Sequence, residues 1–415
     1  MRIISGLEKH RYVAIISAFL ITITLISSMA GCDGDGGNLP PSENLEITTW
    51  YDLDAIRDNL TGNHTLMNNL DSTTPGYQEL ASPTANGGKG WDPIGFYTPQ
   101  GPTAYVGFKG TFDGQGYEIR DLYINRPDEV AIGLFRELGY GGVISDTGAT
   151  SVAVTGGTLG VGGLVAVNDG TISNCHCTGL VTGDEYVGGL VGLTIGGSTV
   201  EHSYFTGSVT GNLQVGGLAG RNTGTVSNCH SIGNVTGIDT VGGLVGYAFF
   251  GSLSNSYSTG SVTGETCIGG LVGLSDTIAP TVETNHVNNS YSSCSVSGNT
   301  YVGGLIGSNG EGSTVRNCYS TGNVTGISWV GGLVGDNRCT EMSIGIVADS
   351  FWDTETSGLT HSDGGTGKNT TEMQDIATFS DAGWNIISVA LNETNPVYIW
   401  NIVNNITYPF LGWQS

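Results

Sequence analysis

Cysteine and histidine are the side chains that most often ligate metals or act as nucleophiles, and this chain has eight of the first and seven of the second in 415 residues. No two cysteines have the CxxC spacing and no Cys/His set has the spacing of a zinc site. HExxH and GxSxG are also absent. We therefore expect no metal site, no cofactor and no hydrolase nucleophile. Cys175, Cys177 and the cysteines after them are interpreted as small buried residues.

Carboxylates are the next candidates for chemistry, because polysaccharide lyases and glycosidases need convergent carboxylates or a poised Lys or Arg. Five acidic residues of the segments that flank the repeats come into question: Asp113, Asp121, Asp349, Asp353 and Glu355. They show no paired register, the acidic residues of the repeats fall mainly in turns, and Arg221, Arg316 and Arg338 are isolated. The sequence therefore predicts no catalytic residues and a protein that is not an enzyme.

One segment imitates a phosphate-binding loop. GGTGKNT, residues 364–370, contains the Gly-Lys pair of the GxxxxGK[ST] pattern. Ser362 stands where the first glycine belongs, and Asn369 stands where the pattern requires a hydroxyl. We do not expect nucleotide binding there.

A short hydrophobic box, VGGLVG and its close variants, fills much of the second half of the chain. Copies begin at Val161, Val187, Val215, Val241, Ile268, Val302 and Val330, at intervals of 26, 28, 26, 27, 34 and 28 residues. The β-branched residues, their alternation and the absence of long helical periodicity favour short strands. A unit of this size buries its apolar side only against neighbouring copies. The sequence predicts an all-β parallel β-solenoid (β-helix) of about seven coils, with three short strands per coil of about 27 residues.

Equivalent positions of stacked coils should form ladders. The fourth position of the box is always leucine, which predicts a structural ladder inside the solenoid: Leu164, Leu190, Leu218, Leu244, Leu271, Leu305 and Leu333. An aromatic ladder is expected from His176, Tyr204, His230, Tyr257, Tyr291 and Tyr319. An asparagine ladder, interrupted by His202, is expected from Asn174, Asn228, Asn255, Asn289 and Asn317. A position for small residues holds Cys175, Ser203, Cys229, Ser256, Ser290 and Cys318.

These boxes resemble the GLUG-motif repeat family, which occurs in bacterial and archaeal surface proteins and beside the peptidase domain of some immunoglobulin-A proteases. The lead-in segment FKGTFDGQGYEIRDLYIN (residues 108–125) and the closing segments SFWDTETSG (350–358) and YPFLGW (408–413) are also similar to such proteins. The resemblance implies an extracytoplasmic, adhesin-like or structural role. Because HExxH is absent, it does not extend to peptidase activity.

The N-terminus has the features of an export signal, with a basic start and an apolar run over residues 12–30. The run ends at Met29-Ala30-Gly31-Cys32, which resembles the lipobox of bacterial-type lipoproteins, with Met29 in place of the usual leucine. We expect a signal peptide over residues 1–31, lipidation of Cys32 and a polar tether over 32–45. An uncleaved anchor and simple secretion are the alternatives, and all three place the remaining chain outside the cytoplasm.

Charge and flanking segments complete the prediction. The formal net charge of −24 disfavours nucleic acid and anionic lipid as partners. We expect an N-terminal cap with lead-in strands over 46–127, the solenoid over 128–350 and an aromatic C-terminal cap over 351–415, whose tryptophans form its core. The predicted function is non-enzymatic adhesion or envelope structure at the cell surface, with glycans or proteins as partners. The alternative is a polysaccharide-binding or polysaccharide-degrading β-helix protein.

Overall fold

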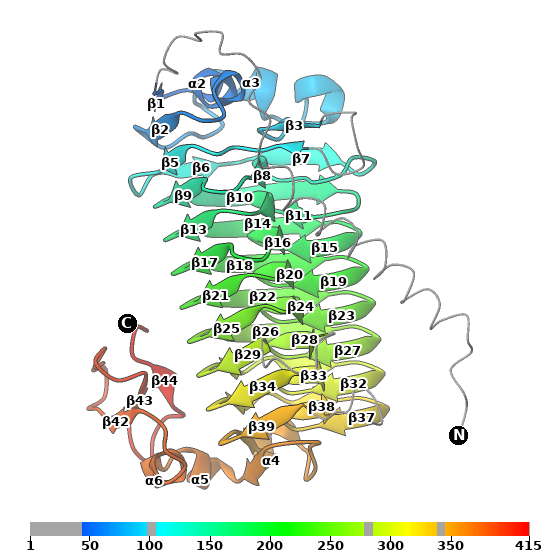
Figure 1. The fold of residues 1–415 in the computed structure, drawn as a ribbon, viewed down its shortest axis with the longest axis vertical. Coiled ribbons are helices and arrows are strands. Elements are labelled where there is room, and N and C mark those ends of the chain that lie inside the picture. Colours follow the sequence, from blue (N-terminus) through cyan, green and yellow to red (C-terminus); the bar gives the residue numbers. More distant parts are fainter. Residues whose placement is uncertain (1–43, 98–104, 278–284, 338–344, 415) are drawn as a thin grey trace, which may run out of the picture. The chain divides into compact units, whose positions relative to one another are not determined.

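The computed structural model describes residues 44–97, 105–277, 285–337 and 345–414, all within one compact unit. The expected signal peptide, Cys32 and most of the tether lie outside the described residues, as do Arg338 and Cys339. Figure 1 shows a stack of short arrows whose coils follow one another along the chain. The predicted all-β parallel solenoid is confirmed, because strand after strand pairs in parallel with the equivalent strand of the next coil.

Four sheets run the length of the stack, and each receives strands from successive coils. The first contains β1 (Glu46–Ile47), β2 (Asn63–Leu66), β5 (Thr111–Asp113), β9 (Val143–Ser145), β13 (Thr171–Ser173), β17 (Thr199–Glu201), β21 (Thr225–Ser227), β25 (Ser252–Ser254), β29 (Asn285–Asn288), β34 (Ser313–Arg316) and β39 (Ile346–Ala348). The second, called here the ladder sheet, contains β6 (Glu118–Arg120), β7 (Tyr123–Arg126), β10 (Gly148–Gly156), β14 (His176–Thr182), β18 (Tyr204–Thr210), β22 (His230–Thr236), β26 (Tyr257–Thr263), β30 (Tyr291–Ser292), β31 (Ser295–Ser297), β35 (Tyr319–Ser320), β36 (Val324–Thr325), β40 (Phe351–Asp353) and β41 (Thr366–Lys368).

The hydrophobic box supplies the other two sheets. Its first half forms β11 (Val161–Gly162), β15 (Glu185–Gly188), β19 (Leu213–Gly216), β23 (Asp239–Gly242), β27 (Thr266–Gly269), β32 (Thr300–Gly303) and β37 (Ser328–Gly331). Its second half forms β12 (Val165–Asn168), β16 (Val191–Thr194), β20 (Ala219–Asn222), β24 (Val245–Phe249), β28 (Val272–Asp276), β33 (Ile306–Asn309) and β38 (Val334–Asp336), preceded in the stack by β8 (Phe135–Leu138).

Each coil thus has four strands where the sequence predicted three, because the box bends at its centre. The second glycine makes the bend feasible: a Cβ on Gly217 would lie 2.1 Å from the Ser231 Oγ and 2.2 Å from the Gly243 carbonyl oxygen. The array also has about eight coils and not seven, since the segment around Ile132 forms a coil of its own and pairs with Val161. That segment lacks the full box, which hid it from the repeat count.

The interior is a continuous apolar column. All seven box leucines are completely buried, and most of the valines and isoleucines that flank them in the box are buried too. In the backbone, Leu218 donates to the Leu244 carbonyl and Leu244 donates to that of Leu271, so consecutive leucines are held in register. Burial of each leucine contributes about 2 kcal/mol relative to exposure, which is how the stack offsets the chain entropy of its glycine-rich coils.

The small-residue position has a specific task. At the bend before the ladder sheet, the backbone N–H of Cys175 donates to the Ser203 Oγ of the next coil at 3.0 Å, and that of Cys229 donates to the Ser256 Oγ at 3.1 Å. The preceding asparagine position explains the bend itself, because all five asparagines and His202 have φ between 47° and 52°. Asparagine tolerates this left-handed conformation better than most residues. Amide bonding between coils is a smaller contribution, seen between Asn317 and Asn289 at 3.3 Å.

Two different structures close the ends. At the N-terminus, short helices and one antiparallel strand pair lie at the first coils. The helices are α2 (Trp50–Asp54), the 3₁₀ turn η1 (Ala55–Asp58), α3 (Tyr77–Leu80) and the 3₁₀ turn η2 (Ala85–Gly88), and the strands are β3 (Phe96–Tyr97) and β4 (Tyr105–Val106). Thr49 and Asp52 form a capping box on α2, which places an acidic residue in the first turn of this helix. At the other end lie α4 (Thr354–Ser357), α5 (Thr370–Met373), α6 (Ile376–Ser380), β42 (Ile386–Ser388), β43 (Trp400–Ile402) and β44 (Phe410–Leu411).

The C-terminal segment, residues 370–414, does more than cover the last coil. It is called the C-terminal module below. Its buried Phe379, Trp384 and Trp400 share a cluster with Tyr319 and Phe351 of the ladder sheet. The tryptophans Trp384 and Trp400 are core residues, as their clustering in the sequence indicated. The module, however, packs on the outer face of the ladder sheet as well as at its end, which the sequence did not predict.

Candidate functional site

Six aromatic side chains stack in one column on the outside of the ladder sheet. Neighbouring ring centroids from His176 through Tyr204, His230, Tyr257 and Tyr291 to Tyr319 are separated by 5.0, 4.7, 4.8, 5.0 and 4.9 Å, with planes within 10° of parallel. Strand pairing fixes this register, because each aromatic residue pairs directly with the next. These distances place His176 and His230 on opposite faces of the Tyr204 ring, so the two imidazoles share no ligand.

The C-terminal module covers part of this aromatic column. Trp413 contacts the rings of His230 and Tyr257, and its Nε1 donates to the Asn255 carbonyl at 3.1 Å. Gln414 Nε2 donates to the Tyr291 hydroxyl at 2.8 Å, and the Tyr319 hydroxyl donates to the Pro409 carbonyl. The module therefore rests on the column from His230 onward, and the rings of His176 and Tyr204 lie beyond its described aromatic contacts.

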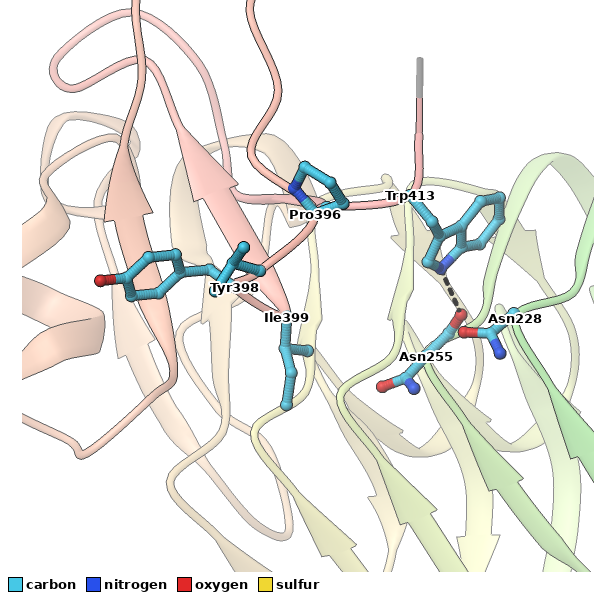
Figure 2. A pocket seen from close by; sticks show the side chains of 8 residues that line it. Asn228, Asn255, Pro396, Tyr398, Ile399 and Trp413 are labelled. Atoms are coloured by element: carbon cyan, nitrogen blue, oxygen red, sulfur yellow. Dashed lines mark hydrogen bonds between the residues drawn. The ribbon is translucent and has the colours of Figure 1, made fainter.

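A hollow of about 200 Å³ opens at the upper edge of this contact (Figure 2). Two asparagines of the solenoid and two short runs of the module line it: Asn228, Asn255, Pro396, Val397, Tyr398, Ile399, Gly412 and Trp413. Figure 2 shows the indole of Trp413 beside the two asparagines, while the Tyr398 hydroxyl points away from them. Buried Asn401 fixes the wall, because its amide bonds to Asn395 through both its oxygen and its nitrogen.

Burial under the module changes the acidity of the column. It lowers the pKa of His230 to about 4, so this imidazole is neutral near pH 7. Burial likewise raises the pKa values of the Tyr257, Tyr291 and Tyr319 hydroxyls. The contact is thus a neutral aromatic seam without a charged group poised for acid–base chemistry among these rings.

A second outward column lies where the box strand begins. One residue in each of six successive coils there has a left-handed backbone, with φ between 55° and 60°, and its type changes from coil to coil: Tyr186, Gln214, Thr240, Cys267, Tyr301 and Trp329. Tyr186 and Thr240 are buried, Gln214, Cys267 and Tyr301 are half-buried, and Trp329 is exposed. This set is called the variable column. Tyr186 contributes to a cation–π group in which the Arg221 guanidinium lies 5.8 Å from its ring and 5.3 Å from that of Tyr247. Arg221, isolated in the sequence, is therefore a packed residue with aromatic neighbours.

Four of the five carboxylates that the sequence offered for catalysis accept hydrogen bonds from backbone N–H groups: Asp113, Asp121, Asp353 and Glu355. Asp353 is fully buried, accepts from the Tyr408 and Thr370 hydroxyls at 2.6 and 2.7 Å, and caps α4. Asp113 accepts the Gln115 N–H, and Asp121 accepts the Ser72 N–H. GGTGKNT is not a loop, because Thr366–Lys368 form β41 and Asn369 caps α5. The structure does not bring the five candidate carboxylates together into one group within the described ranges.

One acidic residue was missed by the sequence reasoning. Burial, followed by the nearby charge of Asp169, raises the pKa of Glu137 to about 7, although Lys109 opposes the shift. The pKa of Asp169 is raised by burial as well. Glu137 faces outward from β8, in the first coil, where the sequence shows no repeat box to mark it. Its signal in the sequence is weak, because Glu137 stands beside Arg136 in a four-residue strand and resembles one half of an ordinary charged pair.

The cysteines and histidines form no metal site in the part of the chain that the structure describes. Cys175, Cys177, Cys229, Cys294 and Cys318 are buried thiols, whereas Cys267 is partly exposed in the variable column. Burial raises the pKa values of the five buried thiols, so they are protonated and unreactive near pH 7.

Comparison with known proteins supports the repeat assignment. The model of the GLUG motif matches residues 183–210, 211–236, 239–263 and 298–325. A 161-residue segment, 38% of this chain, is 34% identical to halomucin of Haloquadratum walsbyi and covers 2% of that protein. A 179-residue segment, 40% of this chain, is 32% identical to a provisionally named Gly-rich membrane protein of Evansella cellulosilytica and covers 19% of it. The chain therefore spans a small part of the length of both relatives.

Among solved structures, the chain is similar to a protein provisionally named an immunoglobulin A1 protease, from Bacteroides ovatus. The two share 18% identity with a TM-score of 0.46, over 92% of this chain and 96% of that one. No helix in the described ranges is both long enough and apolar enough to be a membrane span. The GLUG repeats are thus shown in four segments, and both sequence relatives have names consistent with surface or membrane-associated proteins.

Proposed function

We propose that this protein is a non-enzymatic display rod of the cell surface, anchored through a lipid on Cys32 and acting in adhesion or envelope structure. The observation that carries this proposal is where the coils differ. Inside, every coil repeats the same leucine, while the outward variable column holds Tyr, Gln, Thr, Cys, Tyr and Trp in turn. The residues of this column also differ in exposure, from buried Tyr186 and Thr240 to the exposed Trp329. A scaffold that keeps its interior constant and varies a position outside it is suited to presenting different contacts along its length.

The chemistry of the described residues supports a role in binding over one in catalysis. Four of the five candidate carboxylates accept hydrogen bonds from backbone N–H groups, and the buried thiols are protonated. The names of the two sequence relatives, a mucin-like name and a membrane-protein name, also favour a place at the cell surface. A net charge of −24 suits an exposed rod that must stay soluble and apart from its own copies.

Anchoring and binding are tested separately. Cells expressing the full chain should retain it in the membrane fraction and lose it to intact-cell protease treatment, and Cys32→Ser should release it to the medium. Beads carrying residues 46–415 should then bind intact cells or envelope material saturably. Retention of the chain in the cytoplasm would contradict the surface assignment, and beads that bind nothing would leave a structural spacer as the function.

A polysaccharide-degrading activity is the second candidate, and Glu137 is the observation that favours it. A carboxyl group whose pKa is about 7 is suited to act as a general acid near neutral pH, and Asp169 is the nearby second carboxylate. Incubation with soluble polysaccharides, followed by an assay for new reducing ends, tests this candidate. Activity that Glu137→Gln abolishes would replace the binding proposal, and the absence of new reducing ends would dismiss the candidate.

A further inference from the structure

The last two residues of the variable column form an aromatic pair at the surface, in which Trp329 is exposed and Tyr301 is half-buried. The rings of Tyr301 and Trp329 lie 6.3 Å apart with their planes 29° from parallel. Trp329 is 52% exposed, and Ile327, two residues before it, is 81% exposed. By contrast, Trp384 and Trp400 are buried in the C-terminal module, and Trp413 packs on the aromatic column. Unlike these three tryptophans, Trp329 leaves half of its side chain in solvent and so contributes less to the packing of the fold.

The backbone prevents this pair from turning inward. Tyr301 and Trp329 have φ values of 57° and 55°, a left-handed conformation that costs a bulky residue of order 1 kcal/mol or more. Pairing of Thr300 with Ser328 and of Val302 with Val330 holds them on both sides. The adjacent valine, Val302, is fully buried, so the interior is already occupied. The two rings are therefore fixed on the surface before any partner arrives, which lowers the entropy cost of binding.

The surroundings of the pair are polar and include the exposed acidic residue Glu265. The Ser328 Oγ donates to the Thr300 Oγ1 at 3.2 Å on the exposed surface, and Asn299 lies in the preceding turn. The nearest coil on the N-terminal side contributes Glu265, whose carbonyl accepts from Asn299 and Thr300. Hydroxyl and amide groups beside aromatic rings are the combination that recognises a ligand with one apolar face and several hydroxyls.

We propose that Tyr301 and Trp329 form a stacking platform for a neutral polysaccharide, an inference that rests on the surface function proposed above and names its ligand class. The apolar C–H face of a pyranose ring would lie on the indole, and its hydroxyls would bond to Ser328, Thr300 and Asn299. Charge selects this occupant. A chain with a net charge of −24 repels anionic glycans, anionic membranes and a second copy of itself, whereas a neutral sugar has no such penalty.

The test is affinity electrophoresis of residues 46–415 in native gels that contain hydroxyethyl cellulose, arabinoxylan, mannan or dextran, with polygalacturonate as the anionic probe. We expect retardation in at least one neutral gel and none in polygalacturonate. Trp329→Asn and Tyr301→Asn keep a residue that tolerates the left-handed backbone, and each should weaken the affinity at least tenfold. Trp329→Tyr should restore part of it.

Thr240→Asn is the control for the backbone conformation, because buried Thr240 occupies the same column with φ of 60° and lies between Gln214 and Cys267 there. It should bind as the unmodified chain does, and all variants should have the same circular dichroism spectrum. Absence of retardation in every neutral gel, or equal retardation of Trp329→Asn, would overturn the platform. If beads still bind cells in that case, the surface function stands without it. Self-association or vesicle binding that Trp329→Asn removes would overturn the sugar assignment in favour of a second copy or a membrane.

Discussion

The solenoid and the C-terminal module solve the same problem, burial of a small apolar face, in opposite ways. Each copy of the box contributes one leucine at the equivalent position of its coil, and the core is extended by repetition. The module has no repeat and uses few, large side chains. The ring centroid of Trp384 lies 4.8 Å from that of Phe379 and 4.8 Å from that of Trp400. Its core includes Tyr319 and Phe351, which belong to the solenoid.

The difference teaches where stability is shared. A solenoid is held by nearest-neighbour interfaces, so a defect in one coil interrupts the stack at that point. The module borrows two solenoid side chains, so it depends on the solenoid more than the solenoid depends on it. The largest losses should therefore follow changes inside the coils, and smaller, local losses should follow changes in the module. The smallest effects should come from the partly buried titrating groups Glu137 and His230.

The largest effect is expected from Leu244→Asp. Leu244 is completely buried in the middle of the stack, and an aspartate there would place an unpaired carboxylate against Leu218 and Leu271. We expect a loss of at least about 4 kcal/mol in the free energy of unfolding, enough to disrupt the array. Thermal unfolding followed by circular dichroism measures it.

Asp239→Ala in the same coil is the control. Asp239 is partly exposed and accepts from the Thr240 hydroxyl, its own neighbour in the chain, so its removal should cost about 0.5 kcal/mol or less. Equal melting temperatures for the two variants would contradict the leucine core.

How far the sequence predicts the structure follows the same division. Repetition made the parallel solenoid and the buried leucines readable, because seven copies of one box average out local ambiguity. The bend inside the box was not readable, since a Gly-Gly pair fits a straight strand and a corner equally well until Gly217 is seen against Gly243. The left-handed variable column was missed for a similar reason: residues as different as Thr240 and Trp329 share no sequence signal for a positive φ.

The docking of the module and the acidity of Glu137 could not be predicted from the sequence, because both depend on contacts between distant segments. Trp413 and Asn255 are 158 residues apart, and no pattern in either segment indicates that one donates a hydrogen bond to the other. Clustering of tryptophans predicted a core but not the face on which it rests. Glu137 escaped notice because its raised pKa comes from burial and from Asp169, both of which depend on the stacked coils.

Trp400→Ala should separate the module from the solenoid. Trp400 is fully buried and contacts the rings of Tyr291, Tyr319 and Trp384. Truncation leaves a large cavity, for which we expect a local loss of about 3–5 kcal/mol. Hydrogen exchange should accelerate in β42–β44 while the coils around Leu244 stay protected, and exposed Leu391→Ala should change neither. Loss of protection throughout the solenoid would show that the module is part of one cooperative unit with it.

Glu137→Gln should alter how the stability of the solenoid depends on pH. The folded state holds the pKa of Glu137 near 7, above its ordinary 4.5, so the contribution is complete below pH 4.5 and is lost as the pH rises to 7. Glutamine cannot ionise, so the variant should match the unmodified chain at pH 4 and be more stable at pH 8 by about 2–3 kcal/mol. Urea unfolding at both pH values measures this. Equal stability of the two proteins at pH 8 would mean that Glu137 is solvated.

The smallest change is expected at the seam between the two regions, and it has the opposite sign. Burial under the module lowers the pKa of His230 from 6.5 to about 4. The folded state therefore favours the neutral imidazole, and its contribution is present above pH 6.5 and is lost as the pH falls to 4. Because the ring is partly solvated, we expect about 1–2 kcal/mol. His230→Tyr should remove this component of the acid sensitivity, since tyrosine occupies the same rung in four other coils.

Hydrogen exchange in the C-terminal module at pH 7 and pH 4.5 distinguishes this effect from general acid unfolding. If protonation of His230 weakens the seam, exchange in β43 and β44 should rise at pH 4.5 in the unmodified chain and stay low in His230→Tyr. His176→Tyr is the matched control, because the described rings that His176 contacts do not include one from the module. The opposite result would contradict this prediction: exchange in β43 and β44 that still rises at pH 4.5 in His230→Tyr but not in His176→Tyr. Protonation of His230 would then have no effect on how the module packs.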